Sequence, residues 1–175
     1  MKACIMKVNL RPWQDEHAAE FSHAVISSLD TLKPWMIWAS EDFGASEAKR
    51  WFAITHHLRA TGQAEEFGLF TDDGYILGGA GIRFPQQMEI LPSIGYWVRS
   101  SEQRKGIATA AVRALLEMAF TRPEIEKVEI LAAEANIASR TVAIRAGGEL
   151  TAIRYGLIVL DSGPVNTAIY HISRR

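Results

Sequence analysis

The stretch that decides the fold reads Ile94-Gly95-Tyr96-Trp97-Val98-Arg99-Ser100-Ser101-Glu102-Gln103-Arg104-Lys105-Gly106-Ile107-Ala108-Thr109. Its first residues are mostly aromatic or apolar, which predicts a strand, and a polar loop follows them. A glycine then starts a helix over residues 106–120, in which apolar side chains recur at helical spacing. This order of strand, polar loop and glycine-started helix is the central unit of the predicted fold.

The start of this helix is suited to binding a phosphate group. The first turn of a helix has unpaired backbone N–H groups and the positive end of the helix dipole. Gly106 and the small Ala108 let the backbone approach a pyrophosphate, and Arg104 and Lys105 place positive charge beside it. The alternative is a surface helix that begins at a glycine and carries two solvated basic side chains. Spacing alone leaves both interpretations open.

A second informative segment follows the apolar run 128–133, which predicts a buried central strand. Asn136 begins a helix over residues 136–146, which stops at Gly147-Gly148. The Asn136 side chain is a good helix cap, because its oxygen can accept a hydrogen bond from a free N–H of the first turn. Ser139 lies one turn later and points the same way, so the pair indicates either a cap alone or a small polar site.

The remaining sequence predicts alternating strands and helices around these two segments. Thr71-Asp72-Asp73-Gly74 is a strong hairpin signal, because Asp-Gly accepts the positive φ of a tight turn. We expect one α/β domain over residues 1–175, with a mixed central sheet of about seven strands and helices on both faces. The predicted strands are 4–10, 66–70, 75–84, 94–99, 128–133, 150–159 and 165–172, and the predicted helices are 15–28, 46–60, 106–120 and 136–146.

Composition excludes several classes of protein. The 175 residues are 48% hydrophobic and 22% charged with a net charge of -1, which is ordinary for one globular domain and gives no global field toward nucleic acid or an anionic membrane. No signal peptide or membrane-spanning stretch is recognisable. The single cysteine, Cys4, excludes an internal disulfide and is expected to be a small buried hydrophobe. We therefore expect a soluble cytoplasmic protein with no nucleic-acid or membrane partner.

The loop at the start of the central helix resembles a known signature. Gln103-Arg104-Lys105-Gly106-Ile107-Ala108 is similar to the Gln/Arg-x-x-Gly-x-Gly/Ala motif of the GNAT acetyltransferases, and residues 94–98 resemble the splayed strand of that fold. Asn136 to Ser139 and the later Gly147-Gly148 resemble the family's Asn-x-x-Ser…Gly-Phe block, with Gly148 where the family has Phe. Segments 10–13, 32–38 and 46–52 look most like the RimJ/RimL branch, which acetylates α-amino groups of ribosomal proteins.

The resemblance implies acetyl-CoA as cosubstrate and no metal. In such enzymes the loop grips the pyrophosphate and the splayed strand pairs with the pantetheine arm. The implied catalytic residues are Ser139, which would protonate the departing thiolate, and Asn136, which would bond the arm or an ordered water. Backbone amides around Trp97 and Val98 would donate hydrogen bonds to the oxyanion. The implied cofactor-binding residues are Tyr96, Trp97, Val98, Gln103, Arg104, Lys105, Gly106, Ile107, Ala108, Thr109, Asn136 and Arg145.

The acceptor pocket is expected where the two N-terminal helices meet the hairpin and the last strands. Aromatic side chains from these segments are candidates to line it, and those assigned to substrate binding are Trp35, Trp38, Phe84 and Tyr155. The adjacent His56 and His57 do not predict a metal site, because neighbours on a helix point about 100° apart.

No general base stands out in the sequence. Glu89, Glu134 and Glu149 are the nearby acids, and each is more typical of a solvated surface charge. A site without a strong base suits an α-amine, whose pKa is about 7.7–8.0, better than a lysine at about 10.4. We therefore expect acetylation of a protein or peptide N-terminus by a monomer or homodimer. The alternatives are a small-molecule amine (polyamine, antibiotic or aminoacyl conjugate) and a non-catalytic CoA-binding module.

Overall fold

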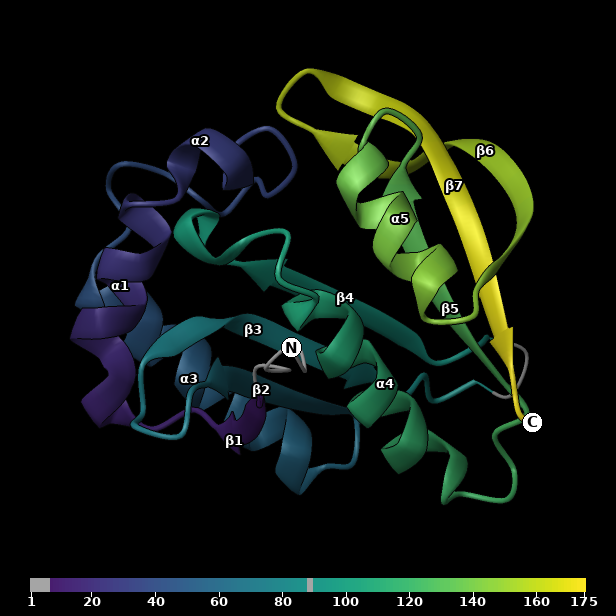
Figure 1. The fold of residues 1–175 in the computed structure, drawn as a ribbon, viewed down its shortest axis with the longest axis horizontal. Coiled ribbons are helices and arrows are strands. Elements are labelled where there is room, and N and C mark those ends of the chain that lie inside the picture. The colour runs from purple at the N-terminus through teal and green to yellow at the C-terminus, as the bar shows by residue number, and fades with distance from the viewer. Residues whose placement is uncertain (1–6, 88–89) are drawn as a thin grey trace, which may run out of the picture.

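The computed structural model describes residues 7–87 and 90–175. One mixed seven-stranded sheet runs through the chain in the order β1-β2-β3-β4-β5-β7-β6 (Figure 1). The predicted mixed sheet of about seven strands is thereby confirmed, although Cys4 and the start of the first predicted strand lie outside the described residues. The strands are β1 (Asn9–Pro12), β2 (Ala64–Phe70), β3 (Ile76–Arg83), β4 (Ser93–Val98), β5 (Lys127–Ala133), β6 (Glu149–Leu160) and β7 (Gly163–Ser173).

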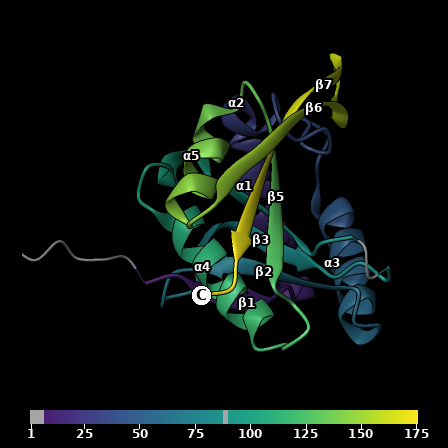
Figure 2. The same cartoon turned by 90° about the vertical axis from the view of Figure 1, so that its right-hand side faces the viewer.

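Helices cover both faces of this sheet. Figure 2 shows α3 on one side and α4 and α5 on the other. The helices are α1 (Ala18–Ile26), α2 (Leu29–Leu32), α3 (Ala45–Ala60), α4 (Ile107–Phe120) and α5 (Ile137–Arg145), with 3-10 turns η1 (Asp15–His17) and η2 (Ser100–Glu102). Among the described residues, none of these helices is long and apolar enough to cross a membrane.

The predicted helix 15–28 is wrong in its extent. It begins as the 3-10 turn η1, and α1 ends at Ile26. The Ser27 hydroxyl donates to the Ala24 carbonyl at 3.2 Å, and the fully buried Ser28 hydroxyl accepts a bond from the Ser100 amide at 3.0 Å. The end of α1 is therefore set by a contact with a distant loop, which local periodicity does not contain.

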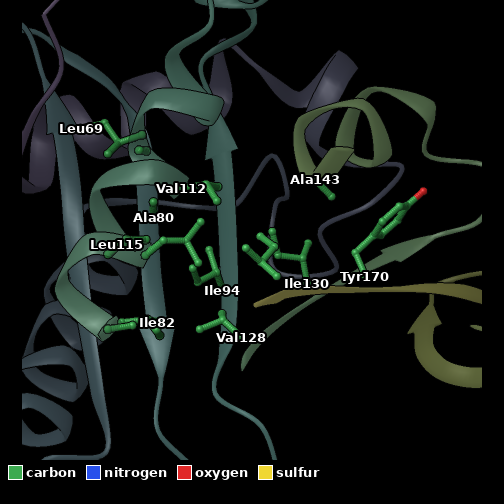
Figure 3. Close-up of a cluster of buried hydrophobic side chains, with 14 of the residues drawn as sticks. Leu69, Ala80, Ile82, Ile94, Val112, Leu115, Val128, Ile130, Ala143 and Tyr170 are labelled. Atoms are coloured by element: carbon green, nitrogen blue, oxygen red, sulfur yellow. The ribbon is translucent and has the colours of Figure 1, made fainter. Parts of the chain in front are cut away.

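Two hydrophobic clusters lie on opposite faces of the sheet. The first packs α4 and α5 against the central strands, and Figure 3 shows Val112 and Leu115 of α4 beside Ile94 of β4. The second packs α1 and α3 against β2 and β3 around Trp13, whose ring stacks on Phe52 with centroids 5.1 Å apart. Together they place the central strands between two layers of helices.

The sheet opens between its two central strands. β4 and β5 are parallel and pair at Ser93 with Glu129, where the Glu129 amide donates to the Pro92 carbonyl at 2.8 Å. From that point β4 stays paired with β3 up to Val98, while β5 stays paired with β7 up to Ala133. The two strands therefore diverge toward their carboxyl ends, as Figure 1 shows.

Candidate active site

Two cavities meet where β4 and β5 diverge. The larger has a volume of about 710 Å³ and lies on the face covered by α1 and α3. The smaller, of about 220 Å³, lies toward the start of α5. Both are lined by the same five residues, which form the passage from one to the other: Met36, Ile94, Gly95, Tyr96 and Leu131. A group that enters from one face of the sheet can therefore meet a group held at the other.

The edge of β4 that faces this passage has free backbone groups. The Arg99 amide donates to the Leu77 carbonyl of β3 at 2.8 Å. Because amides alternate along an antiparallel strand, the Trp97 amide also faces β3, whereas the amides of Tyr96 and Val98 face the opening between β4 and β5. Backbone around Trp97 and Val98 is the predicted donor to the oxyanion. Of these two amides, that of Val98 points into the opening, whereas that of Trp97 points into the sheet.

The loop before α4 has the shape of an anion cradle. Arg104 and Gly106 both have positive φ, 62° and 76°. A side chain at Gly106 would meet no atom within 4 Å, so the backbone angle, and not space, requires glycine there. The predicted helix start moves by one residue, because Gly106 is the N-cap of a helix that begins at Ile107. Consecutive amides in such a turn converge on one point, as in known anion sites.

The first turn of α4 presents its backbone and hides its side chains. No side chain of the described residues caps this helix, so its first amides keep their hydrogen-bonding capacity. Ile107, Ala108 and Thr109 are each at most 9% exposed. These three predicted cofactor-binding residues can therefore contact an anion through their backbone amides but not through their buried side chains.

The basic groups around this cradle differ in their availability. The Lys105 ammonium pairs with Glu102 at 2.8 Å, and Arg104 is exposed beside it. The Gln103 side chain donates weakly to the Val98 carbonyl at 3.4 Å. Arg145 lies at the far end of α5, where its carbonyl accepts a bond from Arg113 of α4 at 3.1 Å.

Ser139 and Tyr96 form a hydroxyl pair across the passage. Asn136 caps α5, its side-chain oxygen accepting from the Ser139 amide at 3.2 Å. The Tyr96 hydroxyl donates to the Ser139 carbonyl at 2.8 Å and lies 3.1 Å from the Ser139 hydroxyl. Since the phenol has one proton, the second contact is donated by Ser139.

Burial raises the pKa of Tyr96 to about 12, against the smaller opposing effect of its bond to Ser139. The phenol therefore stays protonated at neutral pH. If Ser139 gives up its proton, Tyr96 can turn its own hydrogen bond toward the oxygen that remains. Sequence reasoning placed Tyr96 only against the cofactor and missed this contact, whose partners are 43 positions apart.

The larger cavity has aromatic walls and a glycine floor. Trp38 is 40% exposed, with its ring 5.7 Å from Phe43 and 6.0 Å from Trp97. The floor is made by Gly79 and Gly81 of β3 together with Gly95 of β4. Four charged side chains also line it: Glu47, Arg50, Glu66 and Arg83. This cavity can hold an apolar group and a charged one at once.

Two of the four predicted acceptor residues line a cavity and two do not. Trp38 lines the larger cavity and Trp35 the smaller. Phe84 is a core residue, 8% exposed, with the Arg122 guanidinium 3.7 Å from its ring centre. Tyr155 is 71% exposed on the edge strand β6. Trp35 and Trp38 are therefore the acceptor residues that the cavities support, and Phe84 and Tyr155 line neither cavity.

The acids considered from sequence do not line either cavity within the described part of the chain. Glu149 is exposed at the start of β6, Glu134 lies in the turn after β5, and Glu89 falls outside the described residues. His56 contacts the Trp13 carbonyl at 2.6 Å, which ties α3 to the chain after β1. In residues 7–87 and 90–175 no three His, Cys, Asp or Glu side chains gather as metal ligands.

Comparison with known proteins gives consistent results. A family model described as "Acetyltransferase (GNAT) domain" matches residues 7–149. YdaF of Bacillus subtilis (strain 168), provisionally named a ribosomal N-acetyltransferase, is 30% identical over 142 residues, which are 80% of this chain and 76% of YdaF.

Two solved structures share the fold. The microcin C7 self-immunity acetyltransferase MccE, in complex with acetyl-CoA and AMP, superposes with a TM-score of 0.88 at 18% identity, covering 96% of this chain and 93% of that one. The ribosomal L7/L12 α-N-protein acetyltransferase RimL, in complex with coenzyme A, has a TM-score of 0.85 at 20% identity, covering 95% and 93%. At these identities the likeness shows the fold alone.

Proposed function

The chain belongs to the GNAT acetyltransferase family, and we propose that the amine it acetylates is the N-terminal α-amine of a protein or peptide. The enzyme transfers the acetyl group of acetyl-CoA to that amine. The Ser139–Tyr96 hydroxyl pair supports acyl transfer at this opening, and the observation that carries the choice of acceptor is the larger cavity, about 710 Å³, beside it.

The residues around the opening suit acetyl-CoA. The first-turn amides of α4 and the exposed Arg104 would hold its pyrophosphate. The Val98 amide, at the end of β4 nearest the loop before α4, would pair with its pantetheine arm as a missing strand does. Acetyl-CoA supplies an acetyl group activated as a thioester, and the protein supplies its orientation.

The transfer needs three events in the opening. The amine loses a proton, its nitrogen bonds to the acetyl carbon, and the C–S bond breaks. The amide of Tyr96, a residue that lines both cavities, would donate to the carbonyl oxygen as it becomes negative. Ser139 gives its proton to the leaving sulfur, and Tyr96 stabilises the serine oxygen until it is protonated again. Asn136 keeps Ser139 in place through the first turn of α5.

Three observations support an α-amine as the acceptor. The relative YdaF bears a ribosomal N-acetyltransferase name. The larger cavity, about 710 Å³, has room for the first residues of a chain and is open at the exposed Trp38. The pKa of an α-amine, about 7.7–8.0, lets it deprotonate near neutral pH more readily than a lysine. We propose a cytoplasmic enzyme, because the relative YdaF is named for ribosomal acceptors.

The test is thiol release from acetyl-CoA against four acceptor classes: N-terminal peptides, polyamines, aminoglycosides and aminoacyl compounds. We expect turnover with peptides, and a loss of about 100-fold or more in Ser139→Ala if this serine is the acid. Turnover confined to a small-molecule class would replace the acceptor that we propose. Tight acetyl-CoA binding without turnover on any acceptor would favour a CoA-binding module.

A further inference from the structure

The larger cavity contains a carboxylate that the sequence did not single out. Glu66 of β2 lines this cavity, and its side chain is only 14% exposed. In the sheet it pairs with Gly81 of β3, which in turn pairs with Gly95 of β4. A side chain at Gly81 would collide with the Glu66 carboxylate. The carboxylate therefore lies across β3, in the space that a side chain at Gly81 would occupy.

This space leads from β2 toward the reaction centre. Gly95 precedes Tyr96 and belongs to the passage between the two cavities. A side chain at Gly95 would meet nothing within 4 Å, so the space above it is open. Neighbouring strands lie about 4.8 Å apart, so a group above Gly95 is about 5 Å from a carboxylate above Gly81. That separation is longer than a direct hydrogen bond and suits an ammonium group joined to the carboxylate by one water.

The charges around Glu66 leave it able to accept a proton. Within residues 7–87 and 90–175 it has one ion pair, with Arg83 of β3 at 3.8 Å, and that arginine is 67% exposed. Arg59 of α3 donates to the backbone carbonyl of Glu66 and pairs with the carboxylate of Glu65. Burial raises the pKa of the Glu66 carboxyl, against the smaller opposing effects of Arg83 and Arg59. Arg50 of α3 is a further cation in the same cavity.

The other carboxylate of this cavity is committed elsewhere. Glu47 accepts a hydrogen bond from the Gly44 amide at 2.9 Å and closes the N-terminal cap of α3. A hydrogen bond from its own amide, together with the bond from the Gly44 amide, lowers the pKa of Glu47. Among the described residues that line the larger cavity, Glu66 is thus the carboxylate that remains for an amine.

We propose that Glu66 binds the ammonium group of the acceptor and takes the proton that the amine loses before attack. This inference rests on the proposed function. The ammonium gives one proton to the carboxylate through a water, and the neutral nitrogen forms the N–C bond. The C–S bond breaks, and the second nitrogen proton reaches the thiolate sulfur by way of Ser139. Glu66 then releases its proton to solvent. In the overall reaction, an ammonium ion and a thioester are converted into an amide, a thiol and H⁺.

The matched variants are Glu66→Gln and Glu65→Gln, which change adjacent residues of one strand. Glu65 pairs with Arg59 at 2.6 Å and does not line the larger cavity. We expect kcat/KM for the accepted amine to fall by about 100-fold or more in Glu66→Gln, a typical loss for general-base catalysis, and by less than threefold in Glu65→Gln. Acetyl-CoA affinity, measured by calorimetry, should stay within twofold in both, which also shows that both fold.

The pH profile separates a proton acceptor from a structural residue. A carboxylate that takes up an ammonium ion gives wild type a kcat/KM that is flat between the raised pKa of Glu66 and that of the amine, about 7.7–8.0. Glu66→Gln depends on amine that is already neutral in solution, so its kcat/KM should rise about tenfold per pH unit up to that value. Gly81→Ala, which displaces the carboxylate without removing it, should give the same rising profile.

The outcomes distinguish this inference from the proposed function. If wild type acetylates only amines of another class, the proposed function fails, and the variants are then compared on that amine. If wild type acetylates peptides and Glu66→Gln keeps its rate and its flat profile, the assignment of Glu66 is overturned. A rate loss with an unchanged profile also overturns it, because it indicates a packing role.

Discussion

The Tyr96 hydroxyl offers a sharp test of how the leaving sulfur obtains its proton. Tyr96→Phe removes a donor to the Ser139 carbonyl at 2.8 Å and a partner of the Ser139 hydroxyl at 3.1 Å. The carbonyl keeps its partner inside α5, so the folded protein should lose about 1 kcal/mol. For a chain of 175 residues this lowers Tm by about 2–4 °C.

The loss in rate should be larger than this loss in stability. When Ser139 gives up its proton, the bond from Tyr96 becomes a bond to a charged oxygen, worth about 1.5–3 kcal/mol. Its removal should lower kcat by about 10- to 150-fold. Because both residues act on one proton, Tyr96→Phe combined with Ser139→Ala should be no slower than Ser139→Ala alone.

The matched control is Tyr170→Phe, assayed by thiol release at saturating substrates. The Tyr170 hydroxyl also contacts α5, accepting from Arg140 at 2.8 Å, but it does not contact Ser139. It should cost similar stability and change kcat by less than about twofold. The reasoning is refuted if Tyr96→Phe and Tyr170→Phe have equal rates, or if the effects of Tyr96→Phe and Ser139→Ala multiply.

Three further predictions concern the loop, the acceptor wall and alkaline pH. Gly106→Ala and Gly62→Ala both place alanine at positive φ, 76° and 71°, so each should lower the free energy of urea unfolding by about 1 kcal/mol. Only Gly106→Ala should weaken acetyl-CoA binding in calorimetry. Trp38→Ala should raise the acceptor KM about three- to tenfold without changing acetyl-CoA affinity, whereas the control Ile37→Ala, 62% exposed and outside the cavity lining, should change neither. The unfolding free energy should fall as pH rises from about 10 to about 12, because the unfolded chain releases the Tyr96 proton first, and it should fall less in Tyr96→Phe; equal slopes would contradict the raised pKa.

Local sequence signals predicted the elements that carry the cofactor loop. Glycine at position 106, the polar residues before it and the apolar spacing after it are enough to predict a helix start with free amides, and the structure shifts it by one residue. The hairpin signal at residues 71–74 likewise joins β2 and β3 as expected. These features depend on neighbours within a few positions, which sequence patterns contain.

Features that depend on sheet register could not be predicted. Glu66 reaches the cavity because it pairs with Gly81, and a β-bulge between Leu69 and Phe70 sets that register. The hydroxyl pair of Tyr96 and Ser139 depends on how β4 and β5 diverge. Tyr155 was expected in the pocket because it is aromatic, but its side chain is 71% exposed, whereas Ile158 and Leu160 of the same strand line the smaller cavity.

The most direct test of the proposed function is the position of the acetyl group on a product. A peptide with a free α-amine and one internal lysine is incubated with enzyme and acetyl-CoA, and the modified nitrogen is identified by fragment mass spectrometry. We predict a single acetyl group on the α-nitrogen and no product from the same peptide with a blocked N-terminus. Acetyl on the lysine, or an unmodified peptide alongside an acetylated small amine, would contradict it.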